Sequence, residues 1–353
     1  MARPGAGARG RAGRGGAAVT LSVAMCTYNG ARFLPEQLRS IATQTRTPDE
    51  LVVCDDCSSD ETAHVVESFA AAAPFPVRLV RNEARLGSTR NFERAVALCR
   101  GRLIALADQD DSWHPEKLAK LEAALEASGA GLAFCEGEAT DEDLRPLGTG
   151  VWGAVRFGPE EREKFWRGAA FEVLLDHNVV TGAAALFRAE FRDLILPIPL
   201  DLMHDGWRVI HDGWMALLIS AVADIAAVPE RLYSYRQHPG QQLGLRGSLE
   251  GGAGPAPGGA AALREAAQRR NDFDDELHYL SAVYERLSAA APHTPRAGRV
   301  LEGLRARLAH MGARAGMPAP RLGRVPRVLG ELLSLRYHRF SNGFASAAKD
   351  LWL

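Results

Sequence analysis

Clusters of carboxylate or hydroxyl side chains follow directly after three short apolar runs in the N-terminal third of the chain. The runs are TLSVAM, ELVVC and RLIALA, and the segments that follow them read CTYNG, DDCSSD and DQDDSW. If these runs are neighbouring strands, Asp55, Asp56, Asp108, Asp110 and Asp111 would repel one another. A hard divalent cation, Mg²⁺ or Mn²⁺, suits such oxygen ligands. We therefore expect a metal–nucleotide site here, and solvated turns are the plain alternative.

The sequence contains no Walker-type phosphate-binding loop. No G-x-x-x-x-G-K-[ST] is present, and NGARF does not follow the dinucleotide-binding pattern. The phosphates would then be held by the metal and by a few side chains. Arg90, in GSTRNFERAV, is our candidate.

The elements that must position these side chains alternate between strand and helix patterns. Strands are predicted for TLSVAM, ELVVCD, PVRLVR, RLIALAD and GLAFCE, and helices for the segments between them. This alternation predicts an α/β fold with a mostly parallel sheet and helices on both faces. Ligands of such sheets bind at the carboxyl ends of the strands, where the aspartates lie.

Four regions are predicted along the chain. Residues 1–18 form a basic tail rich in Gly, Ala and Arg, which we expect to be disordered, and residues 19–246 form the α/β domain. Residues 247–261, GSLEGGAGPAPGGAA, read as a flexible linker. Residues 262–353 form a helical extension. From Pro292 onward it carries eleven Lys and Arg against three acids, net +8, interleaved with Phe, Tyr, Leu and Trp. This pattern fits a membrane-surface segment or an ordinary packed appendage equally well.

Composition excludes several classes of function. The net charge of −1 argues against a nucleic-acid-binding protein. Five scattered cysteines indicate a reducing compartment without a disulfide framework. The longest apolar runs fall short of the roughly 20 residues that span a bilayer. We expect a cytoplasmic protein, with peripheral attachment to the inner face of the plasma membrane as an option.

These motifs together resemble the family 2 glycosyltransferases, which have the GT-A fold. The resemblance runs from Leu21 to Gly244 and is carried by LSVAMCTYNG, ELVVCDDCSSDET, STRNFERAV and LIALADQDDSWHPEKL. The later segments NVVTGAAALFR, IHDGWMALLISA and PERLYSYRQH are most similar to bacterial rhamnosyltransferase-type members that build cell-surface polysaccharide. One departure is Cys57, where the family usually has Gly or another small residue; we expect it to cause no loss.

The resemblance implies inverting transfer from a nucleotide-diphosphate sugar. The donor would be a dTDP- or UDP-sugar, with dTDP-rhamnose one candidate, and the acceptor a hydroxyl of a glycan or lipid-linked molecule. By motif, Thr27 and Asp56 would hold the base and ribose side of the nucleotide. Asp108 and Asp110 would form the D-x-D motif, with Asp110 the metal ligand. His238 of YRQH resembles a histidine that completes the metal shell in some relatives.

The proton of the acceptor hydroxyl requires a carboxylate base opposite the leaving group. The word HDGW occurs twice, seven residues apart, and supplies Asp205 and Asp212. On one continuous helix the two copies would lie about 10 Å apart, too far to reach the same hydroxyl. Asp212 is our candidate base, because an apolar helix follows it directly and its spacing to YRQH matches the family. The alternatives are Asp205 as the base, or a helix-capping role for the aspartate.

Acceptor contacts are predicted for the region around this base. Thr181 and Gly182 form a polar break in an apolar run, where glycine permits close approach of a ligand; a bulge is the alternative. Trp214 could offer a flat face to an acceptor sugar, although packing is as well supported. Two other functions remain open: a sugar-1-phosphate nucleotidyltransferase, and a sugar-binding protein that has lost its chemistry.

Overall fold

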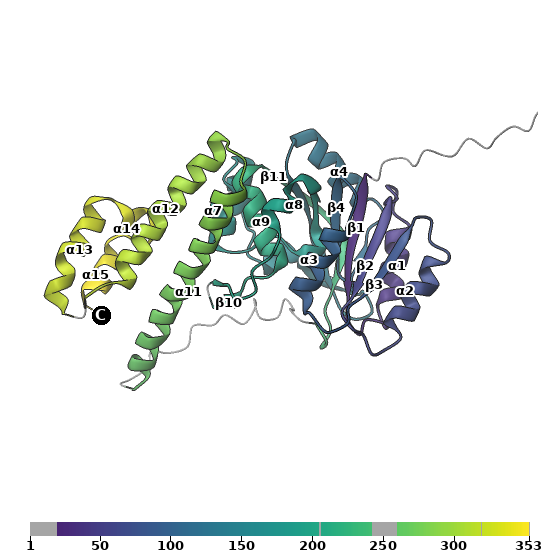
Figure 1. Ribbon diagram of the computed structural model, residues 1–353, viewed down its shortest axis with the longest axis horizontal. Coiled ribbons are helices and arrows are strands. Elements are labelled where there is room, and N and C mark those ends of the chain that lie inside the picture. The colour runs from purple at the N-terminus through teal and green to yellow at the C-terminus, as the bar shows by residue number, and fades with distance from the viewer. Residues whose placement is uncertain (1–19, 205, 242–259, 319, 353) are drawn as a thin grey trace, which may run out of the picture.

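A nine-stranded mixed sheet forms the centre of the protein (Figure 1). The computed structural model describes residues 20–204, 206–241, 260–318 and 320–352. The strand order is β3-β2-β1-β4-β8-β6-β11-β5, with β7 paired to β6. These strands are β1 (Leu21–Thr27), β2 (Glu50–Asp55), β3 (Val77–Arg81), β4 (Leu103–Ala107), β5 (Ser112–Trp113), β6 (Leu132–Thr140), β7 (Pro146–Gly150), β8 (Ala185–Arg188) and β11 (Ile225–Arg236).

Helices fill the connections between the strands. Those of the first 222 residues are α1 (Leu34–Ala42), α2 (Thr62–Ala70), α3 (Ser88–Leu98), α4 (Lys117–Ser128), α5 (Val151–Ala154), α6 (Pro159–Trp166), α7 (Ala170–Asp176), α8 (Arg192–Ile195) and α9 (His211–Val222), with single turns η1 (Gly182–Ala184) and η2 (Ala189–Phe191). The chain moves from β1 through β2 to β3 and then returns across β1 to β4. Right-handed crossovers therefore place α1 and α2 on one face and α3 on the other.

Strand β8 departs from the parallel pattern that the alternation predicts. It lies between β4 and β6 and is antiparallel to both. Its beginning therefore lies at the same edge as the end of β4. Within the apolar segment HNVVTGAAALFR only Ala185–Arg188 form a strand, because Thr181 leads into the turn η1. The segments DIAAVP and RLYSYRQH form one strand, β11, with irregular register between Val228 and Arg231.

The C-terminal helices divide into two parts. They are α11 (Ala260–Ala290), α12 (Pro295–Ala315), α13 (Arg321–Leu333), α14 (Arg336–Phe340) and α15 (Phe344–Trp352). Side chains of α11 and α12, including Leu280, Val283 and Leu304, belong to the same hydrophobic core as the sheet. Helices α13–α15 share a separate small core of Val328, Tyr337 and Ala347 at the far end of the molecule (Figure 1).

The expected boundaries of the extension shift accordingly. Helix α11 begins at Ala260, inside the segment expected to be a linker, while residues 247–259 and the tail 1–18 lie outside the described residues. Because α11 and α12 are built into the main core, only α13–α15 are an appendage with a core of their own.

Candidate active site

The carboxyl ends of β1, β2 and β4 meet at one edge of the sheet. The three strands are parallel neighbours: Thr27 pairs with Asp55, and Ala107 pairs with Met25 near the end of β1. Since β8 is antiparallel to β4, the turn Gly182–Ala184 before it reaches the same edge. Strand β11 is parallel to β6 and brings the segment after Arg236 there too.

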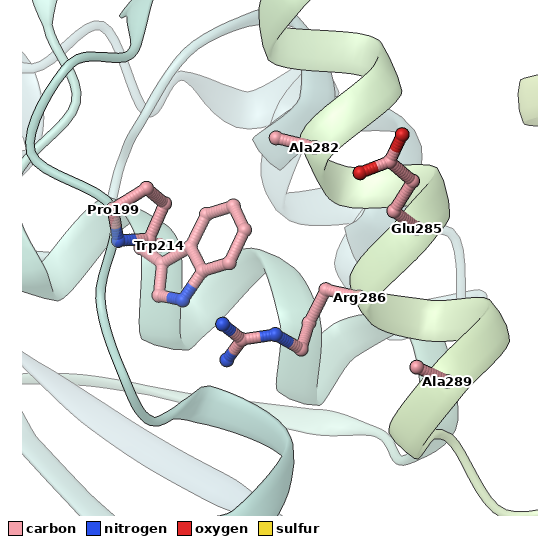
Figure 2. Close-up of a pocket in the computed structure, with 6 residues that line it drawn as sticks. All are labelled: Pro199, Trp214, Ala282, Glu285, Arg286 and Ala289. Carbon is pink, nitrogen blue, oxygen red and sulfur yellow. The ribbon is translucent and has the colours of Figure 1, made fainter.

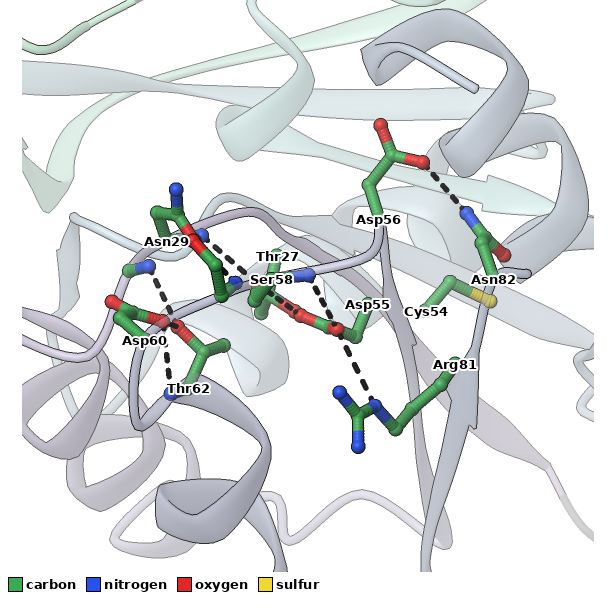
Figure 3. Close-up of polar contacts among 12 residues, drawn as sticks. Thr27, Asn29, Cys54, Asp55, Asp56, Ser58, Asp60, Thr62, Arg81 and Asn82 are labelled. Carbon is green, nitrogen blue, oxygen red and sulfur yellow. Dashed lines mark hydrogen bonds and ion pairs between the residues drawn. The ribbon is translucent and has the colours of Figure 1, made fainter. Parts of the chain in front are cut away.

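Asp55 organises the loop after β2 (Figure 3). Its fully buried carboxylate accepts hydrogen bonds from the Thr27 hydroxyl at 2.9 Å and from the backbone N–H of Ser58 at 3.0 Å. The Arg81 guanidinium lies 3.9 Å away. Thr27 thus contacts the second strand directly, and its hydroxyl helps to hold the loop in place.

Asp56 points to the other side of the loop. Its carboxylate accepts hydrogen bonds from the Asn82 amide at 2.8 Å and from the backbone N–H groups of Leu86 at 2.7 Å and Gly87 at 2.8 Å. Asp55 and Asp56 are therefore each satisfied by protein donors. This corrects the expectation that all five strand-end aspartates need one cation.

Arg90 does not present a free guanidinium. Its Nη1 donates to both carboxylate oxygens of Glu93, at 2.7 and 2.8 Å, and Glu93 also accepts from the backbone N–H of Ile198 at 2.6 Å. The ion pair lies within α3, and the hydrogen bond from Ile198 joins this helix to the segment after α8. This arrangement argues against the expected phosphate contact, because Arg90 would first have to leave Glu93.

The second acidic group, after β4, remains electrostatically strained. Burial, followed by the carboxylates of Asp110 and Asp212, raises the pKa of Asp108 to about 7. Burial, followed by the carboxylates of Asp110 and Asp108, holds the pKa of Asp111 well above its usual range. The Oδ2 atom of Asp111 is buried without a hydrogen-bond partner. These are the aspartates that a cation would relieve.

Asp110 and His238, which the family resemblance links, lie in direct contact. Asp110 Oδ2 lies 2.9 Å from His238 Nε2. Arg236, which is almost wholly buried, holds the loop around them: its backbone N–H donates to Asp111 at 3.2 Å and its Nε donates to the carbonyl of Asp110 at 2.6 Å. The Glu36 carboxylate neutralises the guanidinium at 2.6 Å.

Asp212 lies in the first turn of α9 and faces this acidic group. Its Oδ2 accepts from the backbone N–H of Gly182 at 3.0 Å, and its Oδ1 accepts from the Asn178 amide at 3.2 Å. Because the turn that holds Gly182 lies beside the end of β4, directly before Asp108, the two carboxylates share one site. The second HDGW copy thus meets the D-x-D motif, although more than 100 residues separate them in sequence.

The predicted acceptor residues separate into two groups. The Thr181 hydroxyl lies 2.8 Å from the Tyr233 hydroxyl, and Gly182 contacts Asp212, so both border the site. Trp214 is 1% exposed, and its indole N–H donates to the carbonyl of Ile195 at 3.0 Å. Because it lies two positions after Asp212 on a helix, its ring points elsewhere. The expected sugar-stacking role of Trp214 is therefore wrong.

Trp214 instead borders a cavity of about 310 Å³ between α9 and α11 (Figure 2). Pro199 and Ala282 also line it, and the Arg286 guanidinium lies 5.5 Å from the Trp214 ring. Arg286 donates to the carbonyl of Pro197 at 2.7 Å. The ring is thus part of the junction between the sheet domain and the C-terminal helices.

The first HDGW copy has a different structure from the second. Met203–His204 (β9) and Trp207–Arg208 (β10) pair as a short hairpin, and Gly206 has φ +79°. His204 lies 2.8 Å from a Glu276 carboxylate oxygen of α11. Asp205 lies outside the described residues. One copy therefore forms a turn against α11, and the other begins α9.

Two residues of the site were missed by the sequence reasoning. Lys117 is fully buried; its ammonium donates to the carbonyl of Ala183 and lies 3.5 Å from the Trp113 ring centre. Burial lowers its pKa to about 8, opposed by Asp111 and Asp108 among others. Tyr235 has its pKa raised by burial and then by Asp111, Asp108 and Asp110. The lysine in HPEKL, so close to D-x-D, was the available signal for the first.

No preformed metal cage accompanies these carboxylates. Within the part of the chain that the structure describes, no three His, Cys, Asp or Glu side chains are grouped to hold a metal ion. The adjacent oxygen and imidazole donors of Asp110 and His238 nevertheless suit a divalent cation completed by ligand oxygens from elsewhere.

Comparison with known proteins decides the family. Residues 22–194 match the model described as glycosyl transferase family 2. The chain carries a family 2 glycosyltransferase domain. The glycosyltransferase domain is similar to an uncharacterized glycosyltransferase of Nostoc sp., with 26% identity over 224 residues, 62% of this chain and 65% of that protein.

Further comparisons agree with this family. The abequosyltransferase RfbV of Salmonella typhimurium is 31% identical over 126 residues, 35% of this chain and 38% of that protein. The matched segments cover between 36% and 65% of the lengths of the curated relatives. The structure of S. aureus TarS 1-349 in complex with UDP-GlcNAc has a TM-score of 0.56 at 15% identity, covering 94% of this chain and 88% of that one. The glycosyltransferase domain thus has the expected GT-A fold, followed by C-terminal helices.

Proposed function

We propose that this protein transfers a sugar, with inversion, from a nucleoside-diphosphate sugar to an acceptor hydroxyl. One observation carries the proposal: Asp212, from the later half of the domain, is hydrogen-bonded to the turn before β8, and that turn lies at the same sheet edge as Asp108 and Asp110. An inverting reaction needs a base and a leaving-group site that lie on opposite sides of the sugar. Two carboxylate groups from separate segments, meeting at the ligand-binding edge of the sheet, fit that requirement.

Asp212 is the proposed general base. It would take the proton of the acceptor hydroxyl as the oxygen attacks the anomeric carbon from the side opposite the diphosphate. The Gly182 N–H and the Asn178 amide fix the orientation of the carboxylate before the acceptor arrives. Preorganisation of this kind places the base without further cost when the substrate binds. Thr181 and Gly182 would lie beside the acceptor.

Asp110 and His238 are the proposed ligands of a Mn²⁺ or Mg²⁺ ion. The donor diphosphate would supply further oxygen ligands, which explains why two protein side chains suffice. A bound divalent cation stabilises the negative charge that develops on the leaving diphosphate. Asp108, whose pKa is raised to about 7, lies beside this pair and would complete the cation's surroundings or contact the ribose.

Thr27 and Asp56 are proposed to shape the nucleotide side. Thr27 anchors the loop after β2 through Asp55, and Asp56 holds the backbone of Leu86 and Gly87 in front of α3. The Arg85 guanidinium stacks on the Tyr28 ring at 3.9 Å in the same region, a flat surface suited to a base. We infer a dTDP- or UDP-sugar donor, dTDP-rhamnose among the candidates.

The acceptor is proposed to be a glycan or a lipid-linked molecule of cell-surface polysaccharide assembly on the cytoplasmic side. The name of the abequosyltransferase RfbV, a relative over 35% of the chain, supports a sugar-transferring role of this kind. The nucleotidyltransferase alternative predicts release of pyrophosphate, and the non-catalytic alternative predicts binding without turnover.

A donor screen tests the proposal directly. Purified protein is incubated with Mn²⁺ and a panel of sugar nucleotides, and nucleoside diphosphate release is measured for the wild type, Asp212→Asn and the matched control Asp205→Asn. We expect Asp212→Asn to lose about 100-fold or more of the turnover, as removal of a general base does. Asp205→Asn should keep it. Full activity of Asp212→Asn would refute the assignment of the base.

A further inference from the structure

Helix α13 carries a row of apolar side chains on its outer face. Leu322, Val325, Leu329 and Leu333 are spaced three and four residues apart, so they form one stripe. Leu322 is 88% exposed and Leu333 is 84% exposed. Val328, on another face of the same helix, is buried in the small core with Tyr337 and Ala347. One face of α13 therefore packs on the small core, and the stripe faces the solvent.

The exposed apolar surface of the protein concentrates in this appendage. Of the twelve large apolar side chains exposed in the described residues, seven lie between Arg321 and Trp352. Beyond the four of the stripe, they are Leu335, Phe344 and Trp352. The Arg321 guanidinium lies 5.5 Å from the Trp352 ring, which places this tryptophan beside the beginning of α13. Contiguous exposed patches of this kind mark interaction sites.

The charges of the appendage are sorted by sign. Its two acids are used internally: Glu331 pairs with His310 at 2.7 Å, and Asp350 pairs with Arg314 at 2.7 Å. Four of its exposed bases are not used in this way. Among the described residues, no carboxylate forms an ion pair with Arg321, Arg327, Arg339 or Lys349. Residues 321–352 hold six Lys and Arg and two acids, net +4.

We infer that the α13–α15 appendage docks on an anionic lipid surface. An apolar stripe flanked by arginines is the arrangement that inserts into the headgroup region of a bilayer while its bases contact anionic lipids. Tryptophan at the edge of such a patch favours the same interface. Within the described part of the chain no helix is long and apolar enough to cross a bilayer, so the contact is made along the surface.

A second copy of the chain is the competing occupant, and charge argues against it. Two copies that buried this stripe symmetrically would bring two faces of net positive charge together, which costs electrostatic free energy. An anionic bilayer supplies the opposite sign. The inference does not depend on the proposed sugar transfer, because none of these residues contacts Asp108, Asp110 or Asp212.

Vesicle sedimentation with the full chain tests the inference. Wild type, Leu322→Glu/Leu329→Glu and the control Leu147→Glu/Trp166→Glu are mixed with vesicles of phosphatidylglycerol and phosphatidylcholine or of phosphatidylcholine alone. The control changes two exposed apolar side chains on the glycosyltransferase domain. We expect the α13 variant to lose at least about tenfold in partitioning to anionic vesicles, because carboxylates are disfavoured at that depth. The control should bind like the wild type.

Several results would overturn it. Unchanged binding of the α13 variant would show that the stripe is not the contact. Equal binding of the wild type to both vesicle types, with no weakening in 0.5 M salt, would show that the bases do not contribute. Salt at this concentration screens exposed charges beyond a distance of about 3–10 Å, so it should weaken a contact made by the bases. Sedimentation equilibrium without lipid tests self-association. If the wild type is a dimer that does not bind vesicles, and the α13 variant is a monomer, the stripe is a dimer interface.

Discussion

The carboxylate of Asp212 accepts a hydrogen bond from the backbone N–H of Gly182 at 3.0 Å, which joins the beginning of α9 to the turn before β8. The antiparallel placement of β8 is what brings that turn to the edge where the D-x-D motif lies. The proposed base is therefore positioned by the backbone of a second strand connection. Its geometry depends on how closely α9 and this turn can approach.

Gly182→Ala should disturb this approach. A Cβ atom at position 182 would lie 3.0 Å from His211 Nε2 and 3.6 Å from the Asp212 Cβ. His211 is buried and stacked on Phe92 at 4.0 Å between ring centres, so it has little room to move. We expect destabilisation of about 1–3 kcal/mol, typical of overpacking, and reduced turnover. Urea denaturation measures the first effect.

Gly153→Ala is the matched control for this substitution, because a Cβ there meets nothing within 4 Å. Position 153 lies in α5, where alanine is expected to be neutral or stabilising by up to about 1 kcal/mol. Equal stability changes in the two variants would show that the approach of His211 to Gly182 is not the cause.

Asp108→Asn should stabilise the protein relative to the wild type, and this gain should grow as the pH rises. The pKa of Asp108 is raised from 3.8 to about 7, so the folded state favours the protonated carboxyl. Its stabilising contribution is fully present below the unfolded pKa and is lost as the pH rises through about 7. The asparagine variant does not titrate. The free energy of unfolding of the variant minus that of the wild type should therefore grow between pH 4 and 7, by on the order of 2 kcal/mol.

Chemical denaturation at a series of pH values, without divalent cations, gives this difference. Addition of Mn²⁺ and a nucleoside diphosphate at pH 7 should reduce it, because a cation stabilises the ionised Asp108 of the wild type. A difference independent of pH would contradict the electrostatic account of this residue.

Asp110→Ala and His238→Ala should weaken metal binding in the presence of nucleoside diphosphate. The two side chains are the proposed ligands, and they lie 2.9 Å apart. Loss of either is expected to raise the Mn²⁺ concentration for half-saturation at least about tenfold, since weaker outer contacts alone cost that much. The signal of free Mn²⁺ in electron paramagnetic resonance measures it.

His278→Ala is the control for the histidine, because His278 is exposed and pairs with Asp201 at 3.2 Å, outside the site. Nucleoside diphosphate release that persists in Asp110→Ala with chelator present would reject the metal proposal altogether, while leaving the assignment of Asp212 open to its own test.

Cys57→Gly should stabilise the protein. Cys57 has φ +64°, a left-handed conformation that costs an L-residue roughly 1 kcal/mol and glycine nothing. This conformation suits the Gly that the family motif often has at this position. Thermal unfolding of Cys57→Gly and Cys57→Ala distinguishes the causes: only glycine should gain. Equal gains would attribute the effect to removal of the thiol.

The first four strands and their aspartates were predictable because each signal is local. Apolar runs such as ELVVC end in acidic turns, and the crossover rules then place Asp56 and Asp108 at one edge. The meeting of Asp110 with His238 was also anticipated, but only through the family motif, since no spacing rule links residues so far apart in sequence.

Features that depend on long-range packing were not predictable. The segment ALFR would bury the same apolar side chains in a parallel or an antiparallel strand, so its sequence does not reveal that β8 is antiparallel. The sequence alone allows a sugar-stacking role for Trp214, and only the orientation of α9 shows that its ring is packed inside the protein. Lys117 was missed because a lysine is normally exposed, and only the fold shows that its ammonium lies buried under Asp108 and Asp111.

The continuous core that unites α11 and α12 with the sheet has a mechanical consequence. Helix α11 has 31 residues and is therefore about 46 Å long, and α12 packs along it (Figure 1). Helix α12 contacts α9 of the main domain and α14 of the appendage, so the pair connects the two. If α13–α15 rest on a membrane, this connection sets the distance between the bilayer and Asp212, at the beginning of α9. The protein would then select acceptors by the distance of their hydroxyl from the bilayer.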